Sequence, residues 1–358
     1  MTGESPGAGC APPITAEHGI FVAGTATWLP RQVPVAEEVQ QGRCDPAVAA
    51  ASEMLSVTVS ERDEVAAEMA VRAAREVLRR PGCAASDVGL LLHATSFDQG
   101  LEIWSAASYV QRRAFGESRC PAVEIRQASN GSLASLYLAA SHLIAWPGVR
   151  SVLITTADRF TPPSCDRWAM DRGTVYADGG TAMVLSSRGG FARVLGASLV
   201  SGPELESLHR PGPIDGPAAP DPSRPVDLNP HKKRYLRERG LSRTLDRIEL
   251  GQQLALDLAL DAAGVKLGEI DRFVLPHFIR LRLQSNYLRH LGIDLARTTW
   301  DWNRRIGHLG PGDQIAGLDH LVRSGALVPG RRCALMAVGA GFSWSCAVLE
   351  MESRPPAG

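Results

Sequence analysis

The chain has 358 residues, enough for one large or two medium domains, and its 44% hydrophobic and 21% charged content is that of an ordinary globular protein. Its 38 basic residues balance 38 acidic ones, so no overall charge favours nucleic acid or an anionic membrane surface as a partner. The seven cysteines form neither a CxxC pair nor a cluster with histidine, which argues against a metal site or a disulfide framework and favours a cytoplasmic location.

The amino-terminal segment does not resemble a targeting signal. Residues 1–18 lack the basic and apolar stretches of a signal peptide, and no apolar run approaches the roughly 20 residues of a membrane span. We expect a flexible tail over 1–18 and no membrane partner. The patterns that follow predict a strand at 19–30, a helix at 64–80 that ends before Pro81 and Gly82, and buried strands at 89–97, 150–159 and 179–187. Alternating strands and helices indicate an α/β fold.

A turn inside the segment Val123–Ala140 carries Ser129, directly before an apolar helix. Serine is a favoured helix cap, and Ala-Ser-Asn-Gly is ordinary turn chemistry, so capping alone could explain it. A serine at a helix start also has backbone N–H groups and the positive end of the helix dipole beside it, which would stabilise an acylated nucleophile and its oxyanion. The rest of the chain favours the second interpretation.

The second half of the chain repeats the first. Sliding the sequence by 182 residues places 86–95 on 268–277, and three later segments then match in the same order. These are the turn and helix after residue 129 with 308–322, the strand 150–159 with 331–341, and 179–187 with 341–351. We predict halves at 19–188 and 189–358, with the turn at Ser129 facing its counterpart near residue 308. A Pro- and Gly-rich stretch at about 201–241 predicts an irregular excursion, and 31–62 a smaller one.

A serine nucleophile needs a base and an acid to orient that base. His277 ends a predicted strand, where α/β folds place functional side chains, and His308 lies five residues before Asp313 in a Gly-rich turn. His209, in the excursion, is a third candidate base. Each could instead be structural, and the sequence leaves open which histidine contacts Ser129. The turn around Ala340 could complete an oxyanion hole.

Together these motifs resemble the ketoacyl synthase III family. The resemblance rests on the ASNG turn, YADGGTAMVLSS, LPH after a strand, GHLGPGD and VGAGFSWSCAVL, and it spans residues 19 to 351. It implies a thiolase-like, five-layer αβαβα fold made of two duplicated halves, assembled as a homodimer. It also implies an enzyme that takes an acyl group from coenzyme A, with no bound cofactor, and condenses it with malonyl on acyl carrier protein.

The departures from the family pattern concern the reacting groups. The family's cysteine falls on Ser129, its histidine on His277 within HFIR instead of HQAN, and its asparagine on His308. A stretch that helps to bind coenzyme A is missing from 41–62. This set resembles the starter-unit priming ketosynthases of daunorubicin-type aromatic polyketide biosynthesis, which implies a short acyl-CoA such as propionyl-CoA and a site role for His209.

We therefore expect acylation of Ser129, followed by condensation with malonyl-acyl carrier protein or transfer to the carrier. Ser129→Ala should abolish acylation. The alternatives are a non-catalytic subunit that selects the starter and an esterase using the same serine, although no G-x-S-x-G motif is present. The basic run 231–240 reads as a solvated helix face, but the resemblance makes it, Arg280 and Arg282 candidates for docking carrier protein or coenzyme A. Phe97, Trp104 and Phe342 are candidates for the acyl pocket.

Overall fold

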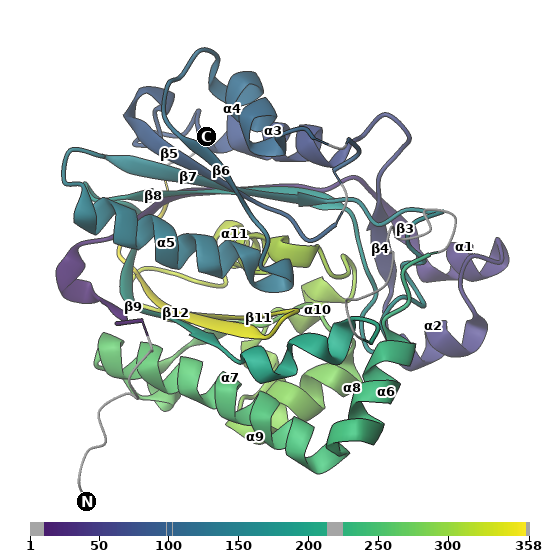
Figure 1. The fold of residues 1–358 in the computed structure, drawn as a ribbon. Coiled ribbons are helices and arrows are strands. Elements are labelled where there is room, and N and C mark those ends of the chain that lie inside the picture. The colour runs from purple at the N-terminus through teal and green to yellow at the C-terminus, as the bar shows by residue number, and fades with distance from the viewer. Residues whose placement is uncertain (1–10, 98, 102, 213–224, 356–358) are drawn as a thin grey trace, which may run out of the picture.

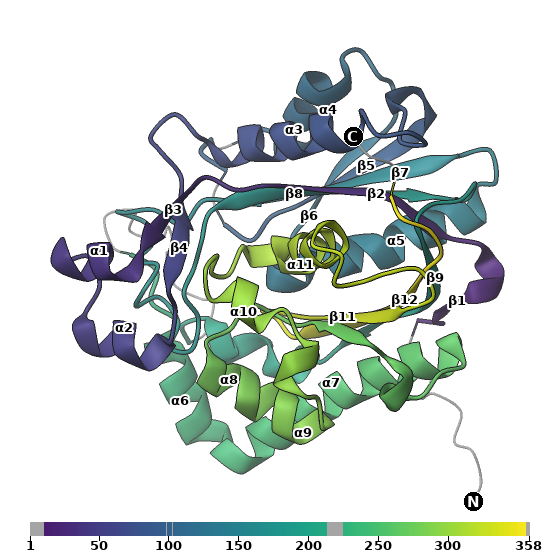
Figure 2. The ribbon, with the colours of Figure 1, turned by 180° about the vertical axis from the view of Figure 1, so that it is seen from behind.

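A computed structural model describes residues 11–97, 99–101, 103–212 and 225–355, and it shows five stacked layers (Figure 1). The outer helices α3 (Ala66–Val77) and α4 (Ala106–Phe115) cover one sheet, and α7 (Leu241–Ala263) covers the other (Figures 1 and 2). Between the sheets lie α5 (Gly131–Ala145) and α11 (Asp313–Arg323), which contact strands of both. The predicted αβαβα architecture is therefore confirmed.

The strands of both sheet layers belong to one continuous ten-stranded sheet, whose two arms are joined by a short antiparallel pairing of Phe21 and Val22 with Arg193 and Ala192. These two arms, called the two sheets below, have the same strand order and the same pairing directions over their first four strands. The first runs β2 (Phe21–Trp28), β8 (Gly179–Ser186), β7 (Ser151–Asp158), β5 (Val88–Ala94) and β6 (Ala122–Ile125). The second runs β9 (Ala192–Ser201), β12 (Ser343–Met351), β11 (Arg332–Gly339) and β10 (Arg272–Val274). In each, the first two pairings are antiparallel and the third is parallel. This repetition confirms the predicted duplication, while the boundary at residue 188 stays a prediction.

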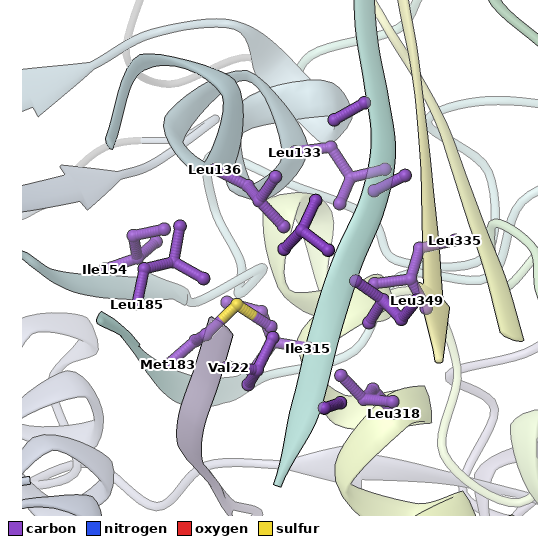
Figure 3. Close-up of a cluster of buried hydrophobic side chains, with 14 of the residues drawn as sticks. Val22, Leu133, Leu136, Ile154, Met183, Leu185, Ile315, Leu318, Leu335 and Leu349 are labelled. Atoms are coloured by element: carbon purple, nitrogen blue, oxygen red, sulfur yellow. The ribbon is translucent and has the colours of Figure 1, made fainter. Parts of the chain in front are cut away.

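The middle layer holds an apolar core because both of its helices face a sheet on either side. Leucine and isoleucine side chains of α5 and α11 pack there against residues of both sheets (Figure 3). The labelled members are Val22, Leu133, Leu136, Ile154, Met183, Leu185, Ile315, Leu318, Leu335 and Leu349. Each buried side chain of this size contributes about 1.5–3 kcal/mol to folding. The starts of α5 and α11 are thereby held in fixed relative positions.

The remaining elements gather at the end of the sheets where α5 and α11 begin (Figure 2). In the first half they are β3 (Arg31–Pro34), α1 (Val35–Gln40), α2 (Pro46–Ser52) and β4 (Ser56–Val59). In the second they are α6 (Asn229–Arg239), α8 (Arg280–Leu283), α9 (Arg289–Leu291) and α10 (Trp300–Asn303). The excursion predicted at 31–62 is therefore a hairpin with two short helices.

Two predictions about irregular segments need correction. The tail predicted over 1–18 is too long, because β1 (Ile14–Thr15) pairs with β9 and buries Ile14, whose apolar side chain outweighs the cost of ordering. Within the excursion at 201–241, the basic run 231–240 lies on the expected helix, α6, but it is not simply a solvated face, because the ring of Tyr235 is buried. Residues 1–10 and 213–224, which belong to these two predictions, lie outside the described residues.

Candidate active site

The turn that carries Ser129 is held from the opposite half of the molecule. Ala128 has a left-handed backbone, with φ of 45°, and Ser129 follows it, half-buried, one turn before α5. Asn130 donates to the hydroxyl of Ser343 (2.9 Å), which donates to the side-chain oxygen of Gln127 (2.8 Å). A left-handed alanine costs roughly 1–2 kcal/mol, and these bonds from β12 hold the turn in that conformation.

Ser129, His308 and Asp313 form a continuous hydrogen-bonded chain. The Ser129 hydroxyl lies 2.7 Å from Nε2 of His308, and Nδ1 of His308 lies 2.6 Å from Oδ2 of Asp313. Both His308 and Asp313 are buried. The prediction that the turn at Ser129 faces the turn at residue 308 is confirmed, and among the three candidate histidines the structure brings His308 into contact with the serine.

His308 is fixed by its backbone as well as by its ring. Its N–H donates to the carbonyl of Val175 (2.8 Å), and its own carbonyl accepts from the N–H of Ala177 (2.8 Å). Between them, the Tyr176 ring meets the imidazole edge-on, with 5.3 Å between centroids. Residues 175–177 thus form a strap that orients His308. Tyr176 and Ala177 begin the motif YADGG, for which the sequence alone suggested no role.

Asp313 is the common anchor of both histidines. Besides the His308 ring, its carboxylate accepts from the backbone N–H groups of His277 (2.7 Å) and Leu309 (2.8 Å). Burial alone would favour the neutral carboxyl, but the imidazoles of His277 and His308 and these hydrogen bonds hold the pKa of Asp313 below its usual value. Asp313 is therefore a carboxylate, able to fix the proton of His308 on Nδ1.

His277 is also buried next to Asp313, but its ring has different hydrogen-bond partners from that of His308. Its Nδ1 is 2.8 Å from the carbonyl oxygen of Gly307, and its ring meets Trp302 edge-on, with 5.6 Å between centroids. Its Nε2 is buried and has no hydrogen-bond partner among the described residues. Burial lowers the pKa of His277, so the ring is neutral near pH 7.

A large cavity opens beside this chain. It has a volume of about 990 Å³ and is bounded by segments of α2, α6, α7 and α8 and by the turn after β11. Ser129 does not line the cavity. It is lined by Val175, whose carbonyl accepts from the His308 backbone, and by Phe342, which directly precedes the Ser343 that holds the Ser129 turn. The cavity therefore borders on residues that adjoin the hydrogen-bonded chain, while Ser129, His308 and Asp313 themselves do not line it.

His209 lies in this cavity and away from Ser129. Its ring stacks on Phe342, with 5.4 Å between centroids and 8° between planes. Burial, together with the nearby charge of Lys232, lowers the pKa of His209 to about 3 and keeps the ring neutral. His209 was a candidate base for Ser129, but the structure places it against Phe342 in the cavity, and His308 is the histidine that contacts Ser129.

The two arginines proposed for docking are both engaged in ion pairs. Arg282 donates to Asp171 (2.9 Å) and Thr174 (2.7 Å), and Arg280 lies 3.2 Å from Glu53. Asp171 also binds Lys232 of α6, so part of the basic run 231–240 faces the cavity wall instead of solvent. Sequence reasoning missed Asp171 because its partners lie 61 and 111 positions away.

The remaining predicted residues are distributed around the site. Ala340 is exposed in the turn after β11, directly after Gly339, which packs against the Ser129 turn. Phe342 lines the cavity, whereas Phe97 packs on Phe160 and does not line it. Trp104 packs on Tyr109 under the outer helices. An acyl pocket built from all three aromatic residues is therefore not supported: their rings belong to different packing clusters.

The described residues show no sign of two other kinds of site. Within them, no group of three or more His, Cys, Asp or Glu side chains is placed to hold a metal ion. No helix in the described part of the chain is both long and apolar enough to cross a membrane.

Comparison with known proteins agrees with this fold. Residues 260–351 match the family model "3-Oxoacyl-[acyl-carrier-protein (ACP)] synthase III C terminal". The structure of ChlB3, an acyltransferase, superimposes with a TM-score of 0.88 and 34% identity, covering 95% of this chain and 99% of that one. A β-ketoacyl-[acyl-carrier-protein] synthase III of Vibrio parahaemolyticus is 26% identical over 332 residues, which are 92% of this chain and 98% of the relative.

A more distant structure shows the shared fold alone. A 3-oxoacyl-(acyl carrier protein) synthase III from Xanthomonas oryzae superimposes with a TM-score of 0.73 at 20% identity, over 93% of this chain and 98% of that one. The fold and the similarities together define a thiolase-fold acyltransferase. The chain belongs to the β-ketoacyl-acyl carrier protein synthase III family.

Proposed function

We propose that this chain is a starter-unit priming enzyme in which Ser129 is acylated by a short acyl-CoA, with propionyl-CoA as the favoured donor. The acyl group then passes to acyl carrier protein, directly or by condensation with its malonyl form. The observation that carries the proposal is the chain from the Ser129 hydroxyl through His308 to Asp313, with distances of 2.7 and 2.6 Å. An aromatic polyketide pathway is the setting that the sequence resemblance suggests.

Each member of the chain has a definite part in acylation. His308, with its proton fixed on Nδ1 by Asp313, takes the serine proton on Nε2 as Oγ attacks the thioester carbonyl. The Asp313 carboxylate stabilises the imidazolium that forms. We propose that the backbone N–H groups of Ser129 and Ala340 stabilise the oxyanion, because Gly339 brings the two turns together.

Serine in place of cysteine explains why an acid is needed behind the base. A thiol ionises near pH 8.5, whereas a hydroxyl must be deprotonated as it attacks. The buried carboxylate of Asp313 holds the Nδ1–H of His308, so that the Nε2 lone pair faces the Ser129 hydroxyl. The same observation argues against a non-catalytic subunit, because a degenerate site has no need of three aligned partners, two of them buried.

The cavity beside the site is proposed to admit the thioester. Its volume of about 990 Å³ exceeds that of a propionyl group and suits a pantetheine arm, and its apolar wall ends at Val175 and Phe342 beside the reacting groups. Docking of the carrier through Arg280 or Arg282 stays a prediction, and it is weaker for Arg282 because the buried Asp171 already binds its guanidinium.

A homodimer is proposed along the edge strand β6. Within the described residues, β6 pairs with β5 on one side and with no strand on the other. Its Val123 is exposed, and Leu138 and Ile144 of the adjoining α5 are exposed apolar residues as well. A second copy pairing there would bury this edge, which otherwise invites nonspecific association.

Acylation can be tested by mass spectrometry of the intact protein. Incubation with propionyl-CoA should add one propionyl group, and peptide mapping should place it on Ser129. Ser129→Ala should lose the adduct and lower turnover by a factor on the order of 10⁴ or more. Ser132→Ala, in the next turn of α5, is the matched control and should keep the adduct. An adduct that persists in Ser129→Ala would reject the proposal, and release of free propionate faster than transfer would favour the esterase.

A further inference from the structure

The two histidines of the site, His277 and His308, both carry their ring proton on Nδ1. Nδ1 of His277 faces the carbonyl oxygen of Gly307 (2.8 Å), and Nδ1 of His308 faces the carboxylate of Asp313 (2.6 Å). Both oxygens can only accept hydrogen bonds, so each neutral ring carries its N–H on Nδ1. Each Nε2 therefore bears a lone pair.

The rings of both histidines are buried. Nε2 of His308 accepts from the Ser129 hydroxyl, and Nε2 of His277 is buried without a partner in the described part of the chain. A buried acceptor without a donor is costly, about 1–3 kcal/mol. A donor group of a substrate that reached this nitrogen would therefore be bound favourably.

This arrangement bears on the second half of the reaction. Decarboxylation of a malonyl thioester develops negative charge on the thioester oxygen, which must be stabilised by N–H or O–H donors. In the resting enzyme, Nε2 of both histidines is an acceptor and not a donor. Acylation brings one proton to a Nε2 atom, that of His308, and this proton lies beside Ser129. An incoming thiol, in contrast, brings the proton that His277 lacks.

We infer that the acceptor of the acyl group is a free thiol rather than a malonyl thioester, and that Nε2 of His277 takes up the proton of this thiol. The inference rests on the proposed function, because it requires an acyl group on Ser129. It assigns His277 as a second base, with a part separate from that of His308. The shared anchor of both residues on Asp313 keeps the two bases in one site.

The steps balance as follows. In acylation, the serine proton moves to Nε2 of His308, the Oγ–C bond forms, the C–S bond of the donor breaks and the donor leaves as a thiolate. In transfer, the acceptor S–H proton moves to Nε2 of His277, a new C–S bond forms and the Oγ–C bond breaks. Ser129 regains its proton from His308, and the proton on His277 passes to water, where it balances the donor thiolate.

The wild-type protein provides the first test. Protein acylated with propionyl-CoA is mixed with N-acetylcysteamine in one reaction and with malonyl-N-acetylcysteamine in another. We expect propionyl-N-acetylcysteamine in the first, and in the second an adduct that persists without release of CO₂. Formation of the 3-ketopentanoyl thioester with CO₂ would overturn the inference while leaving Ser129 acylation intact. Absence of any adduct would instead reject the proposed function.

A variant separates the two bases. In His277→Ala, transfer to N-acetylcysteamine should fall at least about 100-fold, and by a larger factor than adduct formation on Ser129, which depends directly on His308. Adduct formation is itself the check that the variant folds. His93→Leu is the matched control, because it removes another fully buried imidazole whose Nε2 has no partner in the described residues, outside the site. Equal losses in both steps of His277→Ala would overturn the assignment, and if this variant fails to fold, the wild-type products decide.

Discussion

The two central turns of the molecule share a backbone and differ in chemistry. The turn before α5 begins at Ala128 with φ of 45°, the turn before α11 begins at Gly310 with φ of 61°, and each helix starts three residues later. The offset between the turns is the 182 residues found in the sequence repeat. A hydrogen bond joins Ser132 and Gln314, which are also 182 positions apart, across the interface.

What differs is the residue at which each helix begins. A Cβ atom on Gly131 would lie 2.8 Å from Cβ of Ala94, so the first helix can begin only with glycine. The second helix begins with Asp313, whose carboxylate accepts from three N–H groups. One half thus supplies the nucleophile and the other supplies the base and its acid. Neither half has the complete chain, which explains why the chemistry depends on the contact between them.

Among the variants that test this division of roles, we expect Asp313→Asn to reduce the rate of acylation most. The amide can donate to Nδ1 of His308, which would move the imidazole proton to Nε2 and leave no lone pair for Ser129. We expect acylation to slow by a factor on the order of 10⁴, measured by the rate of adduct formation with propionyl-CoA. Asp319→Asn is the control: this buried carboxylate of α11 binds Thr25, away from the site. A loss below about tenfold for Asp313→Asn would show that His308 needs no acid.

A smaller effect is expected from moving one turn against the other. In Gly339→Ala, the new Cβ atom would lie 2.0 Å from the carbonyl oxygen of Gln127 and must displace the turn that carries Ser129. A shift of about 1 Å should reduce the rate of acylation about 100-fold. Gly148→Ala is the control, because Gly148, like Gly339, has no left-handed φ, but its Cβ atom would meet nothing within 4 Å. Equal rates in both variants would mean that the Ser129 turn is not held by β11.

The smallest predicted effect concerns stability and compares one position in the two sheets. His93 and its partner Thr155 (2.9 Å) correspond by the 182-residue offset to Leu275 and Ala337. Burial lowers the pKa of His93 to about 4, below the roughly 6.5 of the unfolded chain. The unfolded state therefore binds more protons between pH 6.5 and 4, and stability falls as the pH decreases through this window.

The double variant His93→Leu with Thr155→Ala gives the first sheet the residues of the second. Between pH 7 and pH 5 it should lose about 2 kcal/mol less of unfolding free energy than wild type, measured by urea denaturation. An identical loss in both proteins would show that other groups cause the acid sensitivity. Ser129 acylation at pH 7 should be unchanged, because neither residue touches the site.

Local patterns in the sequence were sufficient for much of the fold. The helix expected at 64–80 is α3 (Ala66–Val77), and the strands expected at 150–159 and 179–187 are β7 and β8. The repeat also predicted that the turn of Ser129 faces the turn of His308 and Asp313. These features follow from apolar periodicity and from turn residues, which act over a few positions and can be read without knowledge of the partner.

Other features of the site were decided by tertiary structure. Which histidine contacts Ser129 depends on the strap at 175–177, and the pairing of Arg282 depends on Asp171, 111 positions away. The proton on Nδ1 of His277 depends on the carbonyl of Gly307, 30 positions away, whose direction no sequence pattern specifies. The sequence by itself determined the layers, the facing turns and the serine. The hydrogen-bond partners were determined only by tertiary structure, because such bonds require distances set by side chains packed from both halves.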